Sequence, residues 1–410
     1  MKNSNIQWIG DIPDDWEVTK IGQLYQLRNQ KVSDRDYPPL SVTMNGIVPQ
    51  MEHVAKTNAH DDRKLVKKGD FAINSRSDRR GSCGISKYDG SVSLINTVLQ
   101  PLNEMNPNYY DWLFHTVQFA DEFYKWGHGI VDDLWSTNWQ DMKNISVCVP
   151  PLATQTSIAT YLDAKCSEID GLIADINKQI ETLNELKKST ITEVVTKGLN
   201  KNAKLKDSGI QWIGMIPEGW SVSRVKYLLI ERKNFSIYGE EEPLSMSQKY
   251  GLIPTSEMEN VPHQAATLVG SKIANVGDLV FNKLKAHLGV FSVSKYYGLV
   301  SPDYAVYYSN GKSDVKYLEF LFKTQLYISQ FKKLITGVGA GLSRLYTSDL
   351  FSIYSIYPPL AEQQSIATYL DTKCTEFDSI ISDKQKQIST LEAYKKSLIY
   401  EYVTGKTSRP

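Results

Sequence analysis

The sequence has little of the features that mark a secreted protein, a zinc protein or a membrane protein. Its 410 residues include only four cysteines, without the CxxC spacing of zinc sites, and six histidines that do not cluster. No stretch approaches the roughly eighteen apolar residues of a membrane span, and the N-terminus is polar where a signal peptide is apolar. We therefore expect no disulfide framework, no metal site, no membrane partner and a cytoplasmic location.

The chain also lacks an excess of either charge. It has 46 lysines and arginines against 46 aspartates and glutamates, so its formal net charge is zero. A protein that holds nucleic acid by charge alone is strongly basic. If DNA is the partner, the contacts must come from local clusters, or another subunit must supply much of the grip on the phosphates.

Catalytic motifs are missing as well. The "VPPL" at Val149 and the "YPPL" at Tyr357 lack the preceding Asn or Asp of amino-methyltransferase motifs, and "GVGAG" from Gly337 fits neither a dinucleotide loop nor a P-loop. We therefore predict no catalytic residue in this chain. Two alternatives stay open, namely a DNA methyltransferase or nuclease with an unrecognised site, and a duplicated coiled-coil adaptor that does not bind DNA.

What the chain does have is a long internal repeat. "SNIQWIGDIPDDW" from Ser4 agrees with "SGIQWIGMIPEGW" from Ser208 at nine of thirteen positions. "PPLATQTSIATYLDAKCSEID" from Pro150 agrees with "PPLAEQQSIATYLDTKCTEFD" from Pro358 at sixteen of twenty-one. The offsets are 204 and 208 residues, so the chain is a tandem duplication and each copy is about half of it.

Each copy has two parts of different character. Before each Pro-Pro pair, short runs rich in Val, Ile, Tyr and Phe are broken by Gly, Pro, Asn and Asp, which predicts a small α+β domain at 1–149 and, with its linker, at 201–357. One stretch per domain, 107–126 and 315–335, has three-to-four spacing and predicts a single helix. After each Pro-Pro pair, glycine and proline become rare, which predicts long spacer helices in segments 150–200 and 358–410.

The two predicted spacer helices carry apolar residues at alternating spacings of four and three. This 3.5-residue period indicates that each helix needs a partner along its length, and the other copy is the nearest candidate. The alternative is that each helix only covers its own domain, although a helix of about forty residues spans roughly 60 Å. The seam positions that we expect to pair, of which Lys384 alone is charged, are Leu162, Cys166, Ile169, Ile173, Ile176, Ile180 and Leu183 in the first helix and Leu370, Cys374, Phe377, Ile381, Lys384, Ile388 and Leu391 in the second.

Two loops in each domain have the composition of a recognition surface. "NSRSDRRGS" from Asn74 and "NKLKAHLG" from Asn282 each follow a predicted strand, and they differ where the flanking letters agree. Arginine pairs with the acceptor edge of guanine, and lysine pairs with phosphates or guanine, so these loops can read different short words in the major groove. The alternative is a solvated hairpin tip. The candidate DNA-binding residues are Arg76, Arg79, Arg80, Lys283, Lys285 and His287 in these loops, and His128, Ser343 and Arg344 in the loops that precede each Pro-Pro segment.

The chain resembles the specificity subunit of type I restriction-modification enzymes over essentially its whole length. The resemblance lies in the order of domain and long helix, twice, with "QWIG.IP..W" opening each half and "PPL..Q.SIATYLD" opening each helix. It implies that 1–149 and, together with its linker, 201–357 are target recognition domains, each of which reads one half of a bipartite double-stranded DNA target. It also implies that the helices form an antiparallel coiled coil, in a pseudo-two-fold cyclic arrangement, that spaces these domains and docks two methyltransferase subunits.

The same resemblance implies that the chain itself is non-catalytic. S-adenosylmethionine is then expected on the methyltransferase subunits, and ATP and magnesium are expected on partner subunits that include restriction subunits.

Overall fold

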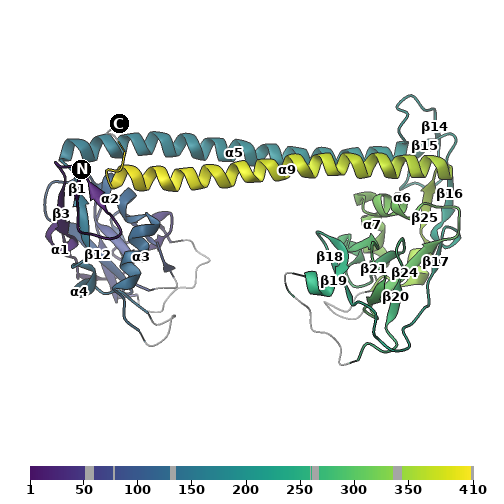
Figure 1. Cartoon of the computed structure of the whole chain (residues 1–410), viewed down its shortest axis with the longest axis horizontal. Helices are drawn as coiled ribbons and strands as arrows, with labels where there is room; N and C mark the ends of the chain where they lie inside the picture. Colours follow the sequence, from purple (N-terminus) through teal and green to yellow (C-terminus); the bar gives the residue numbers. More distant parts are fainter. Residues whose placement is uncertain are drawn as a thin grey trace. The chain divides into compact units, whose positions relative to one another are not determined.

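The computed structural model describes residues 1–50, 60–76, 79–129, 135–258, 260, 267–335 and 344–407. The chain divides into two compact units, one of Met1–Asn177 with Gln385–Pro410 and one of Lys178–Lys384. Each unit contains one domain and one part of each long helix, α5 (Leu152–Lys197) and α9 (Leu360–Val403) (Figure 1). In the described part of the chain, every helix is too short or too polar to cross a membrane.

The first unit is built on antiparallel strands. Its main sheet has the order β10-β9-β12-β4, a second sheet has the order β11-β8-β5, and three pairs are β13 with β3, β6 with β7 and β1 with β2. The strands are β1 (Lys2–Asn3), β2 (Asp11–Ile12), β3 (Glu17–Lys20), β4 (Tyr25–Leu27), β5 (Lys31–Val32), β6 (Leu40–Thr43), β7 (Gly46–Pro49), β8 (Arg63–Val66), β9 (Phe71–Asn74), β10 (Cys83–Ile85), β11 (Gly90–Ser93), β12 (Asn96–Pro101) and β13 (Ser146–Val149).

The helices of the first unit cover the main sheet with aromatic side chains. They are α1 (Ile21–Leu24), α2 (Pro107–Phe114), α3 (Val117–Lys125) and α4 (Trp139–Met142), followed by α5. Phe71 of β9 lies 4.5 Å, between ring centroids, from Phe114 of α2, which in turn lies 4.6 Å from Phe119 of α3. The core of this unit therefore joins the sheet to both helices.

The single helix expected at 107–126 is wrong, because two helices meet there. Thr116 ends α2 by donating its hydroxyl to the carbonyl of Leu113, and it caps α3 by accepting from the amide of Phe119. A threonine at such a position satisfies backbone groups at both helix ends, which a continuous helix does not require. The same break divides the second expected helix at Thr324, between α6 (Val315–Phe322) and α7 (Gln325–Leu334).

The second unit repeats this plan. Its main sheet has the order β17-β24-β21-β22, and four pairs are β18 with β19, β20 with β23, β16 with β25 and β14 with β15. The strands are β14 (Leu205–Asp207), β15 (Met215–Pro217), β16 (Ser221–Arg224), β17 (Leu229–Glu231), β18 (Leu244–Ser247), β19 (Gly251–Pro254), β20 (Lys272–Ala274), β21 (Leu279–Asn282), β22 (Phe291–Val293), β23 (Gly298–Val300), β24 (Tyr304–Ser309) and β25 (Tyr354–Tyr357). Its short helices, besides α6 and α7, are η3 (Val225–Tyr227), η4 (Thr255–Glu257), η5 (Ala286–Leu288) and α8 (Thr347–Ser352).

A glutamine and a tyrosine that occur at equivalent positions of both copies hold the long helices to each domain. In the first unit, the Gln155 side chain accepts a hydrogen bond from the backbone of Asn106 and donates to the carbonyl of Pro150, which ties the start of α5 to the start of α2. The Tyr109 hydroxyl donates to the last carbonyl of α9, that of Val403, at 2.8 Å. Gln363 and Tyr317 make the equivalent bonds in the second unit. Each domain therefore binds the beginning of one long helix and the end of the other.

Within each unit the two long helices pack side by side and antiparallel. Lys395 pairs with Asp170 in the first unit and Lys187 with Asp378 in the second, each with an N–O distance of 2.7 Å. Of the expected seam positions, Leu162, Cys166, Ile169 and Leu370 are buried, and the remaining ones are half-buried with mostly exposed neighbours. Lys384 is half-buried and its ammonium group donates to the side chain of Gln179. The α+β class with two long helices that pair as a coiled coil is confirmed.

Candidate nucleic-acid interface

The arginine loop, residues 75–82, connects β9 to β10. Its turn starts at Asn74, the last residue of β9. The Asn74 side chain accepts a hydrogen bond from the backbone of Arg76 at 3.0 Å, and the Asn74 amide donates to the carbonyl of Ser82 across the loop. Asparagine favours such turns because its carbonyl substitutes for a backbone acceptor. The strand therefore ends at Asn74, and the next residues turn out of the sheet.

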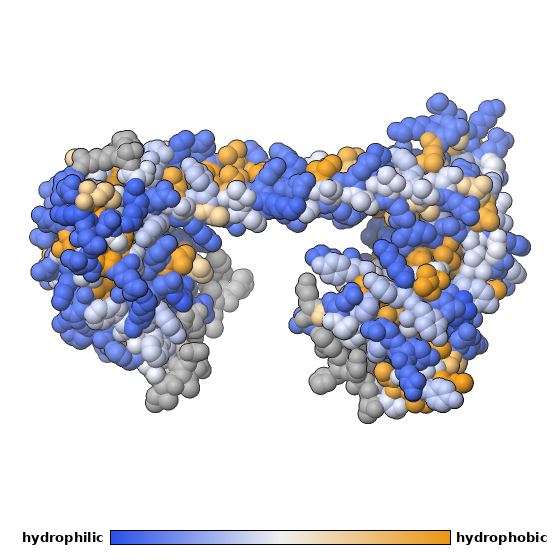
Figure 2. All heavy atoms as spheres, viewed as in Figure 1, coloured by the Kyte–Doolittle hydropathy of each residue, from blue (hydrophilic) through white to orange (hydrophobic). Residues whose placement is uncertain are grey.

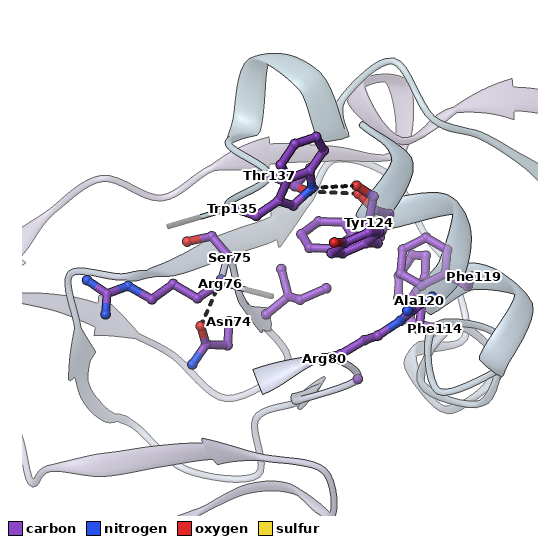
Figure 3. A pocket seen from close by; sticks show the side chains of 13 residues that line it. Asn74, Ser75, Arg76, Arg80, Phe114, Phe119, Ala120, Tyr124, Trp135 and Thr137 are labelled. Atoms are coloured by element: carbon purple, nitrogen blue, oxygen red, sulfur yellow. Dashed lines mark hydrogen bonds between the residues drawn. The ribbon is translucent and has the colours of Figure 1, made fainter. Parts of the chain in front are cut away.

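The three arginines of this loop have different surroundings. Arg76 is exposed, its side chain points away from the neighbouring aromatic residues (Figure 3), and among the described residues none accepts a hydrogen bond from its guanidinium group. Arg80 pairs with Asp121 of α3 and lies over the ring of Tyr124, with 4.9 Å from its guanidinium carbon to the ring centroid. Arg79 is exposed, and its backbone completes the turn. Arg76 is thus the arginine best placed to bind a partner.

A second loop, the histidine loop of residues 127–137, is joined to the base of the arginine loop. His128 and Ser136 exchange two backbone hydrogen bonds of 2.9 and 3.1 Å, and the Thr137 amide donates to the carbonyl of Ser75. Ser136 also forms an isolated antiparallel β-bridge with Arg76. Residues 130–134 of this loop lie outside the described residues. The described part brings His128 and Arg76 into one surface of the first domain.

His128 is exposed, and its ring Nε2 lies 3.3 Å from a carboxylate oxygen of Asp141. The indole of Trp135 stacks on Tyr124, with 5.6 Å between ring centroids, and donates to the Tyr124 carbonyl. A Cβ at Gly127 would lie 2.3 Å from the Trp135 indole nitrogen, so only glycine leaves room for this ring. The tryptophan therefore anchors the histidine loop to α3.

The lysine loop, residues 283–290 between β21 and β22, repeats this construction in the second domain. The Asn282 side chain accepts from the backbone of Leu284, as Asn74 does for Arg76. Lys283 donates to the carbonyl of Pro302 at 3.1 Å, whereas Lys285 is exposed and His287 is half-buried. Of the three candidate residues in this loop, Lys285 has the most accessible charge.

Arg344 lies beside the lysine loop, because the Leu345 amide donates to the carbonyl of Lys283. Its guanidinium nitrogens donate to one carboxylate oxygen of Asp303 at 3.0 and 3.2 Å, which neutralises part of the charge. Ser343, the remaining candidate, lies outside the described residues. The DNA-binding role of all these residues stays a prediction.

Two lysines that the sequence reasoning missed lie close to these loops. Lys64 of β8 donates to the carbonyl of Asn96, and Lys272 of β20, at the equivalent position, donates to that of Tyr304. Burial lowers the pKa of both ammonium groups, and for Lys272 the nearby charge of Lys283 lowers it further. The sequence could have indicated these two lysines, because they occur at equivalent positions of the two copies, 208 residues apart. The described residues contain no group of three or more histidine, cysteine, aspartate or glutamate side chains able to hold a metal ion.

Comparison with known proteins shows what this chain is similar to. Residues 13–182 match the family model described as the type I restriction modification DNA specificity domain. The chain is 26% identical over 431 residues to the putative type I restriction enzyme MjaX specificity subunit of Methanocaldococcus jannaschii, with 97% of this chain and 95% of that protein covered. The MjaVIII specificity subunit of the same organism is also 26% identical, with 96% and 93% covered.

Solved structures show the same fold. A chain from a structure concerned with complex assembly and conformational transition of the type I R-M system has a TM-score of 0.72 at 13% identity, with 97% of this chain and all of that chain covered. The HsdS subunit from Thermoanaerobacter tengcongensis has a TM-score of 0.54 at 14% identity, with 97% and 98% covered.

The duplicated sheet domains and the paired long helices of this chain are similar in fold to the HsdS subunit. Residues 13–182 thus match a type I DNA specificity domain, and nearly the whole chain is similar to type I restriction enzyme specificity subunits.

Proposed function

We propose that this chain selects the DNA target of a cytoplasmic type I restriction-modification complex by reading a bipartite site. The first domain reads one half-site with the arginine and histidine loops, and the second reads the other with the lysine loop and Arg344. The chain performs no chemistry. Methyltransferase subunits hold S-adenosylmethionine, and restriction subunits use ATP and magnesium.

The observation that carries this proposal is the recurrence of one loop construction with different side chains. In both domains an asparagine ends the strand, and a backbone bond joins two loops at their base, from Thr137 to Ser75 and from Leu345 to Lys283. The backbone plan is thus the same, while the side chains differ: the loop of the first domain carries three arginines, and that of the second carries two lysines and a histidine. Two readers that share a scaffold and differ in base-contacting side chains need this arrangement.

The long helices offer matching surfaces for two methyltransferase subunits. Leu172 of α5 and Ile380 of α9, at equivalent positions of the two copies, are exposed, as are Leu186 and Tyr394. Figure 2 shows the surface over the helices as mostly hydrophilic with separate hydrophobic patches. Exposed apolar patches with polar surroundings are typical of protein interfaces. Each long helix thus carries exposed apolar side chains at the same two positions, which supports the binding of two copies of a partner.

Sequencing of methylated bases in cells that carry the chain and its partners tests the reading assignment. Changing Arg76, Arg79 and Arg80 together to Ala should relax or abolish one half of the methylation motif and leave the other half unchanged. The matched control, Lys283→Ala with Lys285→Ala, should affect the opposite half. An unchanged motif in the arginine variant would refute the loop assignment.

Two further measurements address the alternatives. Methyl transfer by the purified chain with DNA and labelled S-adenosylmethionine would make it an enzyme. A complex whose binding to DNA is absent, or does not weaken with salt, would make it an adaptor.

The helices are proposed to set the gap between the half-sites, which an insertion in α5 near Glu185 tests. Four extra residues add about 6 Å of rise and a net rotation of about 40°. One base pair adds about 3.4 Å and about 34–36°, so the rotation matches one base pair. We expect the same half-site words with the gap lengthened by one base pair. Altered words with an unchanged gap would show that the helices do not measure the spacing.

A further inference from the structure

A small cavity lies beside the arginine loop of the first domain (Figure 3). Its interior volume is about 20 Å³. A water needs about 10–15 Å³ of such space, so the cavity holds one group of the size of a water or a methyl. Its walls are mainly apolar and include Ile73, Phe114, Phe119, Ala120, Tyr124 and Trp135, and both Arg76 and Arg80 also line it.

Three uncharged side-chain donors in the wall already donate hydrogen bonds within the domain. The Trp135 indole donates to the carbonyl of Tyr124 at 2.9 Å, and the Thr137 hydroxyl donates to that of Phe123 at 2.7 Å. The Ser75 hydroxyl donates to the carbonyl of Ile95. A water in a cavity needs two to four polar partners, whereas these three donors are already used and most of the wall is apolar. The cavity therefore favours an apolar group.

The second domain fills the corresponding space with its own side chain. Ile328 stands at the position equivalent to Ala120, and Gly289 at that of Gly81, both at an offset of 208 residues. A Cβ built on Gly289 would lie 3.8 Å from Cδ1 of Ile328, whereas one built on Gly81 would meet nothing within 4 Å. The fold thus accepts an isoleucine here, and the first domain has an alanine and an open space.

We propose that this cavity takes the 5-methyl group of a pyrimidine base in the half-site that the first domain reads, which makes Ala120 a specificity-determining residue. The inference rests on the proposed reading function. The thymine methyl is the apolar group that unmodified DNA presents in the major groove, and 5-methylcytosine carries the same group. Arg76, exposed at the edge of the cavity, can then bind a neighbouring guanine.

The test uses the full chain in its complex with methyltransferase subunits, on duplexes that carry the recognised target. Each thymine in turn is replaced by uracil, which lacks only the methyl, and in a second series each cytosine is replaced by 5-methylcytosine. Removal of one buried methyl weakens binding about fourfold, rising to tenfold or more in a close-fitting pocket. We expect a loss of this size at one thymine of one half-site. A gain at one cytosine would instead identify 5-methylcytosine as the source of the methyl.

Ala120→Ile assigns this effect to the cavity. The variant copies the second domain, so it should fold, and it should bind thymine and uracil equally because the added carbon atoms occupy the cavity. Ala120→Ser keeps the space open and should keep the preference. The inference is overturned if the unmodified complex binds its target specifically with no methyl preference in either series, or if Ala120→Ile retains the preference. Loss of all sequence-specific binding by the unmodified complex would instead refute the proposed function.

Discussion

The partly buried ion pair between Arg28 and Asp70 in the first domain recurs in the second between Arg232 and Asp278, with the same shortest N–O distance of 2.6 Å. The tyrosine that holds the end of a long helix recurs as well. By contrast, Arg76 is replaced by a leucine at position 284, and Ala120 is replaced by Ile328. The constant residues support the scaffold, and the substitutions lie where a DNA half-site is proposed to bind. After the duplication, the two copies thus retain the same scaffold residues, while their candidate DNA-binding surfaces differ.

One difference between the copies lies away from these surfaces. Glu319 of α6 is buried between Lys316 and Lys323, whereas the equivalent Asp111 of α2 lies near His115. Burial raises the pKa of Asp111. Burial also acts to raise that of Glu319, but the two lysines outweigh it and lower its pKa. Equivalent carboxyl groups therefore respond to pH in opposite directions.

The largest effect is expected from breaking the helix pair in one copy at a time. Ile173 and Ile381 are equivalent seam positions, each half-buried. Ile173→Asp places a charge against the partner helix and should lower the free energy of unfolding by about 3 kcal/mol, with release of the methyltransferase subunits. Urea unfolding and co-purification measure both, and Asn177→Asp, at an exposed position, is the control. An intact complex with Ile173→Asp would show that helix pairing does not hold the assembly.

A smaller effect, with a pH signature, is expected at the unequal carboxyl groups. Glu319→Gln should lower the free energy of unfolding by about 1.5–3 kcal/mol at pH 7, because it removes charge-assisted hydrogen bonds from a buried group. A lowered pKa in the folded state stabilises above the unfolded pKa, and this stabilisation is lost as the pH falls through the folded pKa. The cost of Glu319→Gln should therefore shrink as the pH falls below about 4.

Asp111→Asn is the matched control for this pH dependence. Because the pKa of Asp111 is raised, its ionised form is disfavoured in the folded state, and its stabilising contribution is lost as the pH rises. Asp111→Asn should thus lower the free energy of unfolding least at neutral pH. Denaturant unfolding of both variants between pH 7 and pH 3.5 measures the two trends, and parallel trends would contradict the comparison.

Arg76 and Arg80 lie in the same loop, and we expect the first to recognise a base of the DNA and the second to contribute only to stability. Arg76→Ala should lower discrimination at one base pair of one half-site by about 1–3 kcal/mol, since a bidentate arginine contact to guanine has that value. Arg80→Ala removes an exposed pair with Asp121 and should change stability by about 1 kcal/mol or less. Methylation assays on single-base variants of the target, beside thermal unfolding, distinguish the two. Equal loss of discrimination in both variants would show that Arg80 also reads DNA.

The sequence predicted what depends on local period and repetition. The apolar seam positions of both long helices, 162–183 and 370–391, follow a spacing of three and four residues that is visible in the sequence. The duplication showed that each domain is followed by a helix. What it could not predict depends on residues far apart. Asp121 pairs with Arg80 across 41 positions, and the cavity needs both Ala120 and Gly81 to lie together. The break at Thr116 was missed because the apolar spacing continues through it.

The smallest effect is expected where one copy has a hydrogen bond that the other lacks. The Trp220 indole donates to the carboxylate of Glu362 at 3.1 Å, whereas the buried Trp16 indole has no partner among the described residues, and Thr154 stands at the position equivalent to Glu362. Thr154→Glu should raise the free energy of unfolding by about 0.5–1.5 kcal/mol. A glutamate in the first turn of α5 also gains from the helix dipole, by about 0.3–1 kcal/mol.

A double-mutant cycle with Trp16→Phe separates these two contributions. If the indole is the partner, Thr154→Glu should lose most of its gain in the Trp16→Phe chain, because no N–H remains to donate. A gain of the same size in both chains would assign it to the helix dipole alone. The reverse change, Glu362→Thr, should then cost the second unit the same amount as Thr154→Glu adds to the first, since it recreates the unpartnered indole of the other copy.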